Sequence, residues 1–188
     1  MILSDRTIKE EIEGGRLVID PLDPGSIQPA SVDVRLDRKL LVGRADLHIP
    51  YIDVRQKLED LNELVELKGD QPFLLEAGGF ALVSTLELIG LPDDIVARLE
   101  GKSSLARIGL LVHSTAGYVD PGWRGHLTLH VSNLAKFPIT LYYGMKIGQI
   151  SFLRLTSPVE NLYGSTMLGS KYQGQTGPTG SRYNRNFS

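Results

Sequence analysis

The sequence predicts a mainly β domain of the sandwich or barrel type, with a few short helices. From Ser31 onward, short apolar or alternating segments recur, and glycine, proline, aspartate or asparagine residues separate them at short intervals. Many short strands with such spacing are typical of all-β sandwiches and barrels. The length of 188 residues is enough for one domain with a sizeable core and too small for two ordinary ones. We therefore expect a single domain over residues 1–188.

A short helix is expected at the start of the chain. Ser4 is a favourable N-cap residue, and Leu3 and Ile8 are spaced as a hydrophobic staple. The pair Gly14-Gly15 is a stop signal for a helix. The expected helix therefore begins after Ser4 and ends before Gly14.

Alternation with a period of two marks the first expected strand, where Val32, Val34 and Leu36 alternate with charged residues. Further strands are expected at residues 73–75, 80–83, 95–97, 127–131, 139–142 and 147–153. Residues 55–67 are ambiguous, because their apolar residues are spaced as a helical stripe while their high charge favours a loop.

Composition limits the kinds of partner. The net charge is −2, and without a basic excess neither a nucleic acid nor a membrane surface is an expected partner. The sequence contains no apolar run that approaches the roughly 20 residues needed to span a bilayer. Its first residues lack the pattern of a signal peptide, so a cytoplasmic protein is expected.

Cysteine is absent from the sequence. Its absence excludes disulfides and any zinc site with cysteine ligands. Zinc-dependent nucleobase deaminases use a Cys-x-x-Cys pair, so their chemistry is excluded as well. The four histidines form no His-Glu-x-x-His pair, and we expect no metal site made by protein side chains.

The strongest local feature is the run Gly101-Lys102-Ser103-Ser104-Leu105-Ala106-Arg107, which follows an expected strand and would open a short helix. A serine cap, unpaired backbone N–H groups, the helix dipole and the Lys102 ammonium would together suit a phosphate group. A capped surface helix with incidental charge explains the same run equally well. The Gly-Lys-Ser triplet is not a Walker A loop, because Val96 stands where that motif needs its first glycine.

A second feature is the run from Ala116 to Gly125, in which Asp120 precedes a Pro-Gly turn. A turn aspartate is most often structural, and the functional alternative is a carboxylate aimed at a bound sugar or at water. Trp123 is the only tryptophan of the chain, and we expect it to serve packing.

The character of the chain changes after Tyr163. Glycine alternates with serine, threonine, lysine and glutamine, and apolar residues nearly vanish. Composition alone favours a disordered tail. The functional alternative is a flexible C-terminal lid over residues 163–188 that closes on a ligand.

Several of these motifs together resemble the dCTP deaminase family of the dUTPase superfamily. The matching segments are 28–36 (QPASVDVRL), 99–107 (LEGKSSLAR), 119–125 (VDPGWRG), 131–133 (VSN), 138–141 (PITL), 144–149 (GMKIGQ), 163–165 (YGS) and 169–175 (GSKYQGQ). They occur in the family's order and cover nearly the whole chain. The likeness is greatest to the bifunctional, dUMP-forming branch, because the small pair Ala116-Gly117 follows Ser114-Thr115.

The resemblance implies a distorted β jelly roll, the dUTPase-like β-barrel, with short helices and assembled as a homotrimer with active sites between subunits. It implies a hydrolase of pyrimidine deoxyribonucleotide metabolism that converts dCTP to dUMP or dUTP and so supplies dTTP synthesis. Nucleotides of the dCTP, dUTP and dTTP type are the implied ligands. Mg²⁺ is the implied cofactor, bound mainly through the triphosphate.

The resemblance also implies individual site residues. The implied catalytic residues are Ser103, Arg107, Asp120 and His130. The implied substrate-binding residues are Lys102, Ser103, Ser104, Leu105, Ala106, Arg107, Ala116, Asp120, Thr128, Leu129, His130, Gln149, Tyr163, Lys171 and Gln175. In the family, the segment that matches 102–107 binds the nucleotide, the residue that matches Asp120 approaches the sugar, and the segment that matches 128–130 recognises the base.

His130 departs from the family pattern, in which a glutamate at this position accepts a proton from the attacking water and returns it to the cytosine. Neutral imidazole can also accept a proton, but its ring is larger and its two nitrogens are not equivalent. Three interpretations stay open: deamination lost or greatly weakened with nucleotide binding or phosphate hydrolysis kept, deamination retained with His130 as the base, and a different pyrimidine substrate.

The sequence around Asp120 favours phosphate hydrolysis independently of His130. The pattern Val-Asp-x-x-aromatic-x-Gly around it is similar to that of trimeric dUTPases, where the aspartate orients the water that attacks the α-phosphate. A dUTP diphosphatase without deaminase activity is therefore one alternative function. A non-catalytic, nucleotide-binding regulatory module on the same scaffold is another.

Overall fold

The structure, a computed structural model, describes residues 1–112 and 116–187 of the chain. Its helices are α1 (Asp5–Glu13) and α2 (Ser103–Ala106), with the short 3-10 turns η1 (Pro24–Ser26), η2 (Glu59–Leu61) and η3 (Tyr183–Asn186). Its strands are β1 (Val18–Asp20), β2 (Ile27–Gln28), β3 (Ser31–Gly43), β4 (Asn62–Glu66), β5 (Phe73–Leu75), β6 (Phe80–Gly90), β7 (Ile95–Gly101), β8 (Leu110–Val112), β9 (Tyr118–Val119), β10 (Arg124–Asn133), β11 (Ile139–Leu141) and β12 (Lys146–Arg154). Among the described residues, no helix has the length and apolar character required to cross a membrane.

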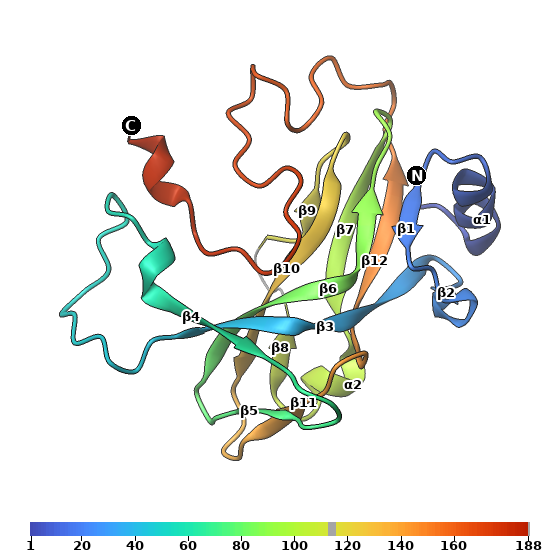
Figure 1. Ribbon diagram of the computed structural model, residues 1–188. Coiled ribbons are helices and arrows are strands. Elements are labelled where there is room, and N and C mark those ends of the chain that lie inside the picture. The colour runs from blue at the N-terminus through green and yellow to red at the C-terminus, as the bar shows by residue number, and fades with distance from the viewer. Residues whose placement is uncertain (113–115, 188) are drawn as a thin grey trace.

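Ten of the described strands form one antiparallel sheet that curls around a common core (Figure 1). Neighbouring strands follow the order β8-β10-β6-β3-β12-β7-β9, while β1 pairs with β6, and β2 and β4 pair with β3. The strands β5 and β11 form a separate two-stranded sheet. The mainly β, barrel-like class predicted from the sequence is confirmed.

The long strand β3 joins the two halves of the curled sheet. Its residues Val32–Arg35 pair with β12, whereas Leu40–Val42 pair with β6 on one side and with β4 on the other. The register between β3 and β6 shifts between Leu36 and Leu40, and such irregularities allow a strand to bend from one half of a sheet into the other. In Figure 1, β3 crosses the middle of the molecule.

Alternation along the strands supplies the core. Val32, Val34 and Leu36 of β3 are fully buried, and so are Leu129 and Val131 of β10. Burial of an aliphatic side chain stabilises a fold by about 1.5–3 kcal/mol, so the apolar face of each strand is held inward. A slip of one residue would turn that face toward solvent. The same pattern therefore also determines which side chains of each strand face away from the core.

Both predicted helices are confirmed. The carbonyl of Ser4 accepts the first hydrogen bond of α1 from Ile8 N at 2.9 Å. Leu3 and Ile8 are both buried, as their staple spacing predicted. In α2, the prediction of a serine cap is wrong, because the backbone of Lys102 is still extended where β7 ends and Ser103 is already helical.

Residues 55–67 do not form the helical stripe, and only residues 55–58 form the loop that the sequence suggested as the alternative. The turn η2 is followed by β4, which pairs along the second half of β3. Without β4, this edge of β3 would leave backbone N–H and C=O groups unpaired. A pairing with a distant strand leaves no trace in the local spacing of apolar residues, which explains the error.

Candidate active site

A cavity of about 1110 Å³ lies between β10, β6 and the segment that follows Tyr163. Its volume is large enough to hold a nucleotide. The residues predicted from the sequence that line it are Ala116, Asp120, Thr128, His130, Tyr163 and Gln175. They come from separate parts of the chain, so the fold brings them together.

Strand β10 presents Thr128 and His130 to the cavity. Their neighbours Leu127, Leu129 and Val131 are buried in the core, so the period of two sends the polar side chains to the opposite face. The predicted alternation of this strand is confirmed. Leu129, a predicted contact, has a fully buried side chain, so any contact that it makes with a ligand must go through its backbone.

A β-bulge sets the position of these side chains. The register between β10 and β6 shifts between His126 and Thr128. At this point Leu127 N donates to the hydroxyl of Thr85 at 2.9 Å. That hydroxyl in turn donates to Glu87 O at 2.8 Å, and the ring nitrogen Nδ1 of His126 lies 3.0 Å from Thr85 O. Because bulges re-aim the side chains beside them, the buried Thr85 helps to determine where β10 points.

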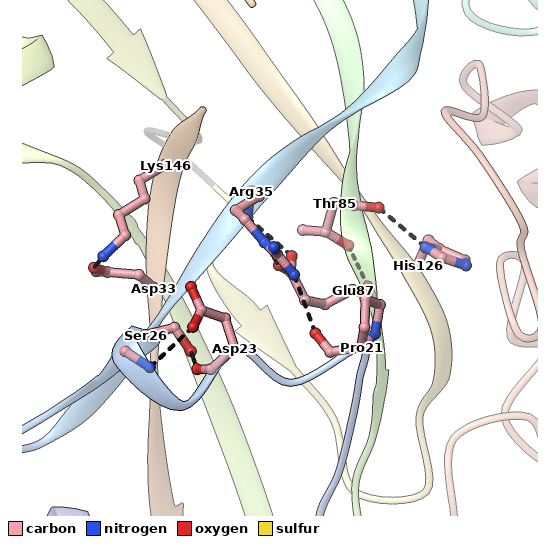
Figure 2. A network of polar contacts seen from close by, with 10 residues as sticks. Pro21, Asp23, Ser26, Asp33, Arg35, Thr85, Glu87, His126 and Lys146 are labelled. Carbon is pink, nitrogen blue, oxygen red and sulfur yellow. Dashed lines mark hydrogen bonds and ion pairs between the residues drawn. The ribbon is translucent and has the colours of Figure 1, made fainter. Parts of the chain in front are cut away.

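The polar network continues from β6 toward the N-terminal turn, as Figure 2 shows. The buried Glu87 carboxylate accepts hydrogen bonds from Arg35 N at 2.9 Å and from Arg35 Nε at 2.6 Å. Arg35 Nη2 also donates to Pro21 O at 3.2 Å. A buried charge is tolerated when it is paired and hydrogen-bonded, so this ion pair anchors β6 at the bulge.

The imidazole of His130 stacks against the ring of Phe80 on β6. The ring centroids are 6.3 Å apart and the ring planes are inclined by 29°. Both side chains line the cavity. The stacking contact restrains the orientation of the imidazole while its partly exposed ring stays within reach of the cavity.

Asp120 lines the cavity from a tight turn. Trp123 N donates to Asp120 O at 3.1 Å, which closes the turn. Gly122 has a φ of +84°, and a Cβ at this position would lie 2.7 Å from the Cβ of Leu162, so only glycine fits. Trp123 is 6% exposed and its ring packs 5.4 Å from that of Tyr163. The predicted packing role of Trp123 is confirmed.

Burial raises the pKa of the Tyr163 phenol, and the negative charge of Asp120 acts in the same direction. The phenol oxygen accepts a hydrogen bond from Tyr172 N at 3.3 Å. The Tyr163 hydroxyl therefore stays protonated at neutral pH and can donate a hydrogen bond to a ligand in the cavity.

One edge of β10 pairs with β8 at residues 131–133. Nearer the start of β10, His126 and Thr128 form hydrogen bonds with the tail instead. The carbonyl of Gln175 accepts a hydrogen bond from His126 N at 3.0 Å, and the side-chain Nε2 of Gln175 donates to His126 O at 2.7 Å. Thr179 N donates to the hydroxyl of Thr128 at 3.1 Å. The tail thus contacts the strand that carries the predicted residues, and its role as a flexible lid stays a prediction.

A second group of predicted residues lies apart from this cavity. The segment Lys102–Arg107 forms α2 and its flanks, and within the described chain it is not part of the cavity wall. Its two serines and Arg107 are exposed. Gln149 of β12 pairs with Glu100, shortly before that segment. Figure 1 shows α2 near one end of the curled sheet and the tail over the other. The predicted site residues of one chain therefore lie in two separate groups.

The cavity residues that were not predicted include Phe80, Tyr172 and Thr179. Tyr172 lies within the tail motif that carries the family resemblance, so that motif could have drawn attention to it. Lys171, a predicted contact, lies beside Tyr172 in the tail, and its carbonyl accepts a hydrogen bond from Arg182. Phe80 and Thr179 lie in segments without a recognised motif, and only the folded chain brings them to the cavity.

Gly117 lies so close to β7 that a side chain would not fit. Leu99 N donates to Gly117 O at 2.8 Å, and a Cβ on Gly117 would lie 2.9 Å from Leu99 O. This approach accounts for a glycine at the second position of the predicted Ala-Gly pair. The Ser114-Thr115 part of the same motif lies outside the described residues.

Similarities to a family model, to two named proteins and to one solved structure bear on this site. The family model described as dCTP deaminase-like matches residues 2–155. A protein of Nocardioides sp. named dCTP deaminase, dUMP-forming, is 56% identical over 187 residues, which span 100% of this chain and 97% of that protein. A protein of Mycolicibacterium vanbaalenii with the same name is 57% identical over 187 residues, which span 100% of this chain and 98% of that protein. The crystal structure of 2′-deoxycytidine 5′-triphosphate deaminase from Agrobacterium tumefaciens superimposes with a TM-score of 0.63 and 27% identity, over 80% of this chain and 47% of that one.

Proposed function

The chain belongs to the dCTP deaminase-like family, and we propose that it is a pyrimidine deoxynucleoside triphosphate hydrolase that forms dUMP from dCTP. The observation that carries the proposal is the placement of Asp120 and His130 on one cavity. The two relatives named dCTP deaminase, dUMP-forming, match this chain over its whole length, which supports the same product here. The proposed reaction consumes two water molecules and releases dUMP, ammonia and pyrophosphate.

In the deamination step, water attacks C4 of the cytosine and the exocyclic amine leaves as ammonia. Neutral His130 accepts the proton of the attacking water, and a proton returns to the leaving amine. The position of His130 on the cavity face of β10, restrained by Phe80, supports this role. Because the chain contains no cysteine, the zinc site of the cysteine-bearing deaminases is not available. The proposed deamination is therefore independent of zinc.

In the hydrolysis step, a second water attacks the α-phosphorus and pyrophosphate leaves. Asp120 orients this water and accepts its proton. The turn closed by Trp123 N and the glycine at position 122 hold Asp120 against the cavity, which supports the assignment.

Mg²⁺ enters as part of the substrate, in complex with the triphosphate. It neutralises charge on the leaving pyrophosphate. Within residues 1–112 and 116–187, no group of three or more His, Cys, Asp or Glu side chains could hold a metal ion. In nucleotide-binding enzymes, Mg²⁺ is usually held mainly by phosphate oxygens and water.

His130 favours a second candidate function, a dUTP diphosphatase without deaminase activity. The resembling family has glutamate at this position, whose two oxygens shuttle a proton at short reach, whereas imidazole is larger and has inequivalent nitrogens. A displacement of about 1 Å at a catalytic group can cost about a hundredfold in rate. Phosphate hydrolysis would persist, because Asp120 and its turn are built from other residues.

We also propose a homotrimer, in which each active site forms between two subunits. The cavity and the α2 segment are separate half-sites within one chain, so a second chain is needed to bring them together. Ile108, Leu134 and Phe137, which follow α2 and β10, are 55%, 69% and 77% exposed. Exposed apolar side chains of this kind often mark interfaces. A stable, fully active monomer in light scattering would contradict the trimer.

We propose as well that residues 163–188 act as a lid over the nucleotide. The hydrogen bonds of Gln175 and Thr179 to β10 support this role, since they place the tail beside the cavity. The many glycines make ordering of the tail entropically costly. Contacts of Lys171 and Gln175 with the nucleotide would offset that cost.

Product analysis by chromatography tests the proposed function. The protein is incubated with dCTP or with dUTP, each in the presence of Mg²⁺. Formation of dUMP from dCTP is the expected result. Formation of dUMP from dUTP alone would establish the diphosphatase instead, and dUTP as the end product of dCTP would contradict the hydrolysis step. Nucleotide binding without any turnover would contradict both candidates and favour a regulatory module.

A further inference from the structure

A buried carboxylate, that of Asp33, holds two lysines side by side. Asp33 is 3% exposed, and its two oxygens form ion pairs with Lys102 and Lys146. Lys146 Nζ lies 3.1 Å from Asp33 Oδ2, and Figure 2 shows the Lys146 side chain reaching from its strand to the carboxylate. The side chains of Lys102 and Lys146 are 23% and 46% exposed. An anion can therefore reach the ammonium groups but not the carboxylate.

The cluster has a net charge of +1, because two ammonium groups meet one carboxylate. Among the described residues, neither Lys102 nor Lys146 has an ion-pair partner other than Asp33. One cation is enough to neutralise a buried carboxylate, so the second is not required for charge balance. An ammonium group has three N–H donors, and each lysine directs one of them to Asp33. The remaining donors can serve an anion.

Strand register places this cluster beside the half-site that contains α2. The strand β12 lies between β3 and β7, so that Gln149 pairs with Asp33 on one side and with Glu100 on the other. Lys146 stands at the start of β12, and Lys102 directly follows β7. Lys146 therefore lies near two residues, Lys102 and Gln149, for which the family resemblance implies contact with the substrate.

We propose that Lys146 is a further binding residue for the triphosphate, held beside Lys102 by their shared pairing with Asp33. This inference rests on the proposed function, from which it takes the nucleoside triphosphate as the ligand. The two ammonium groups bind the phosphates beyond the α-phosphate, which carry most of the negative charge. Asp33 does not contact the ligand but keeps both lysine side chains from moving out into solvent.

A purely structural role for Lys146 makes a different prediction. If Lys146 only neutralised Asp33, its removal would lower stability and leave the preference for triphosphate over monophosphate unchanged. If Lys146 binds the outer phosphates, its removal weakens binding of the triphosphate selectively. Comparison of a triphosphate with a monophosphate therefore separates the two roles.

Isothermal titration calorimetry in the presence of Mg²⁺ provides this comparison. The triphosphate is α,β-imido-dUTP, which resists hydrolysis, and the monophosphate is dUMP. We expect Lys146→Met to weaken binding of α,β-imido-dUTP about tenfold, which corresponds to about 1.4 kcal/mol. Binding of dUMP should stay unchanged, because dUMP lacks the outer phosphates. Lys146→Arg should retain most of the affinity, since it keeps the charge. The effect of Lys146→Met should shrink as salt is added, because the lost interaction is between charges.

Lys9→Met is the matched control, because it removes the same charge from a different element, α1. Lys9 Nζ lies 3.8 Å from Asp5 Oδ2. The control variant should leave both affinities unchanged. A thermal melt checks that Lys146→Met is folded, and Lys146→Gln is a second neutral variant. Equal affinities in the unaltered protein and Lys146→Met, or equal weakening for both nucleotides, would overturn the inference alone. Failure of the unaltered protein to bind either nucleotide would overturn the proposed function, and the inference with it.

Discussion

Replacement of Thr85 by valine removes the hydroxyl that holds the bulge of β6 against β10. That hydroxyl is fully buried, donates to Glu87 O at 2.8 Å and accepts from Leu127 N at 2.9 Å. Valine has nearly the same shape but can neither donate nor accept. A buried N–H left without a partner costs about 1–3 kcal/mol, and a lost neutral hydrogen bond costs about 1 kcal/mol. We therefore expect the free energy of unfolding to fall by about 2–4 kcal/mol.

Equilibrium unfolding in urea measures this loss, at one fixed protein concentration because the stability of an oligomer depends on concentration. Trp123 is the only tryptophan and is 6% exposed, so its fluorescence reports unfolding next to the cavity. Thr85→Ser is the matched control, since it keeps the hydroxyl and loses one methyl group, at an expected cost of about 1 kcal/mol. If Thr85→Val were as stable as Thr85→Ser, the hydroxyl would not hold the bulge, and the explanation of how β10 aims its side chains would fail.

Three further predictions concern the two half-sites and the tail. Truncation at Gly164 should abolish turnover and leave the oligomer intact, as steady-state kinetics and light scattering can show; unchanged kinetics would refute the lid. Arg107→Ala and Ser103→Ala should each lower kcat by roughly a hundredfold, because loss of a donor that stabilises developing negative charge costs about 3 kcal/mol. Wild-type rates of both variants with every pyrimidine triphosphate would mean that the active site lies elsewhere. Asp120→Asn should reduce pyrophosphate release more than ammonia release from dCTP, because an amide cannot accept the proton of water, and equal losses in parallel assays would contradict the separate roles of Asp120 and His130.

The core strands could be predicted because burial of one face leaves a period of two in the sequence. In β10, Leu127 and Leu129 face the core, so the spacing of apolar residues alone was enough to assign Thr128 and His130 to the opposite face. The turn at Asp120 was equally visible, because proline and glycine at consecutive positions restrict the backbone locally.

Features that depend on contacts between distant segments could not be predicted from the spacing of residues in the sequence. Asp33 alternates with apolar residues as a solvent-facing residue would, yet it is 3% exposed, because two lysines from other parts of the sheet pair with it. The role of Thr85 depends on its hydrogen bond to Leu127 of β10, at the bulge where residues 85–87 of β6 oppose Leu127 alone, and β4 depends on the open edge of β3. The separation of the Lys102–Arg107 segment from the cavity follows from sheet order, which residue spacing alone does not encode.

The initial rate of ammonia release from dCTP, compared between the unaltered protein and His130→Glu, tests most directly the claim that the residue at position 130 carries the proton in deamination. Glutamate supplies two equivalent oxygens at short reach, so the variant should release ammonia faster, while dUMP formation from dUTP should change little because Asp120 is untouched. Any ammonia release by the unaltered protein should be lost on acidification, since imidazolium has no lone pair to accept the proton of water. Ammonia release that is unaffected by the glutamate, or reduced by it, would contradict the claim.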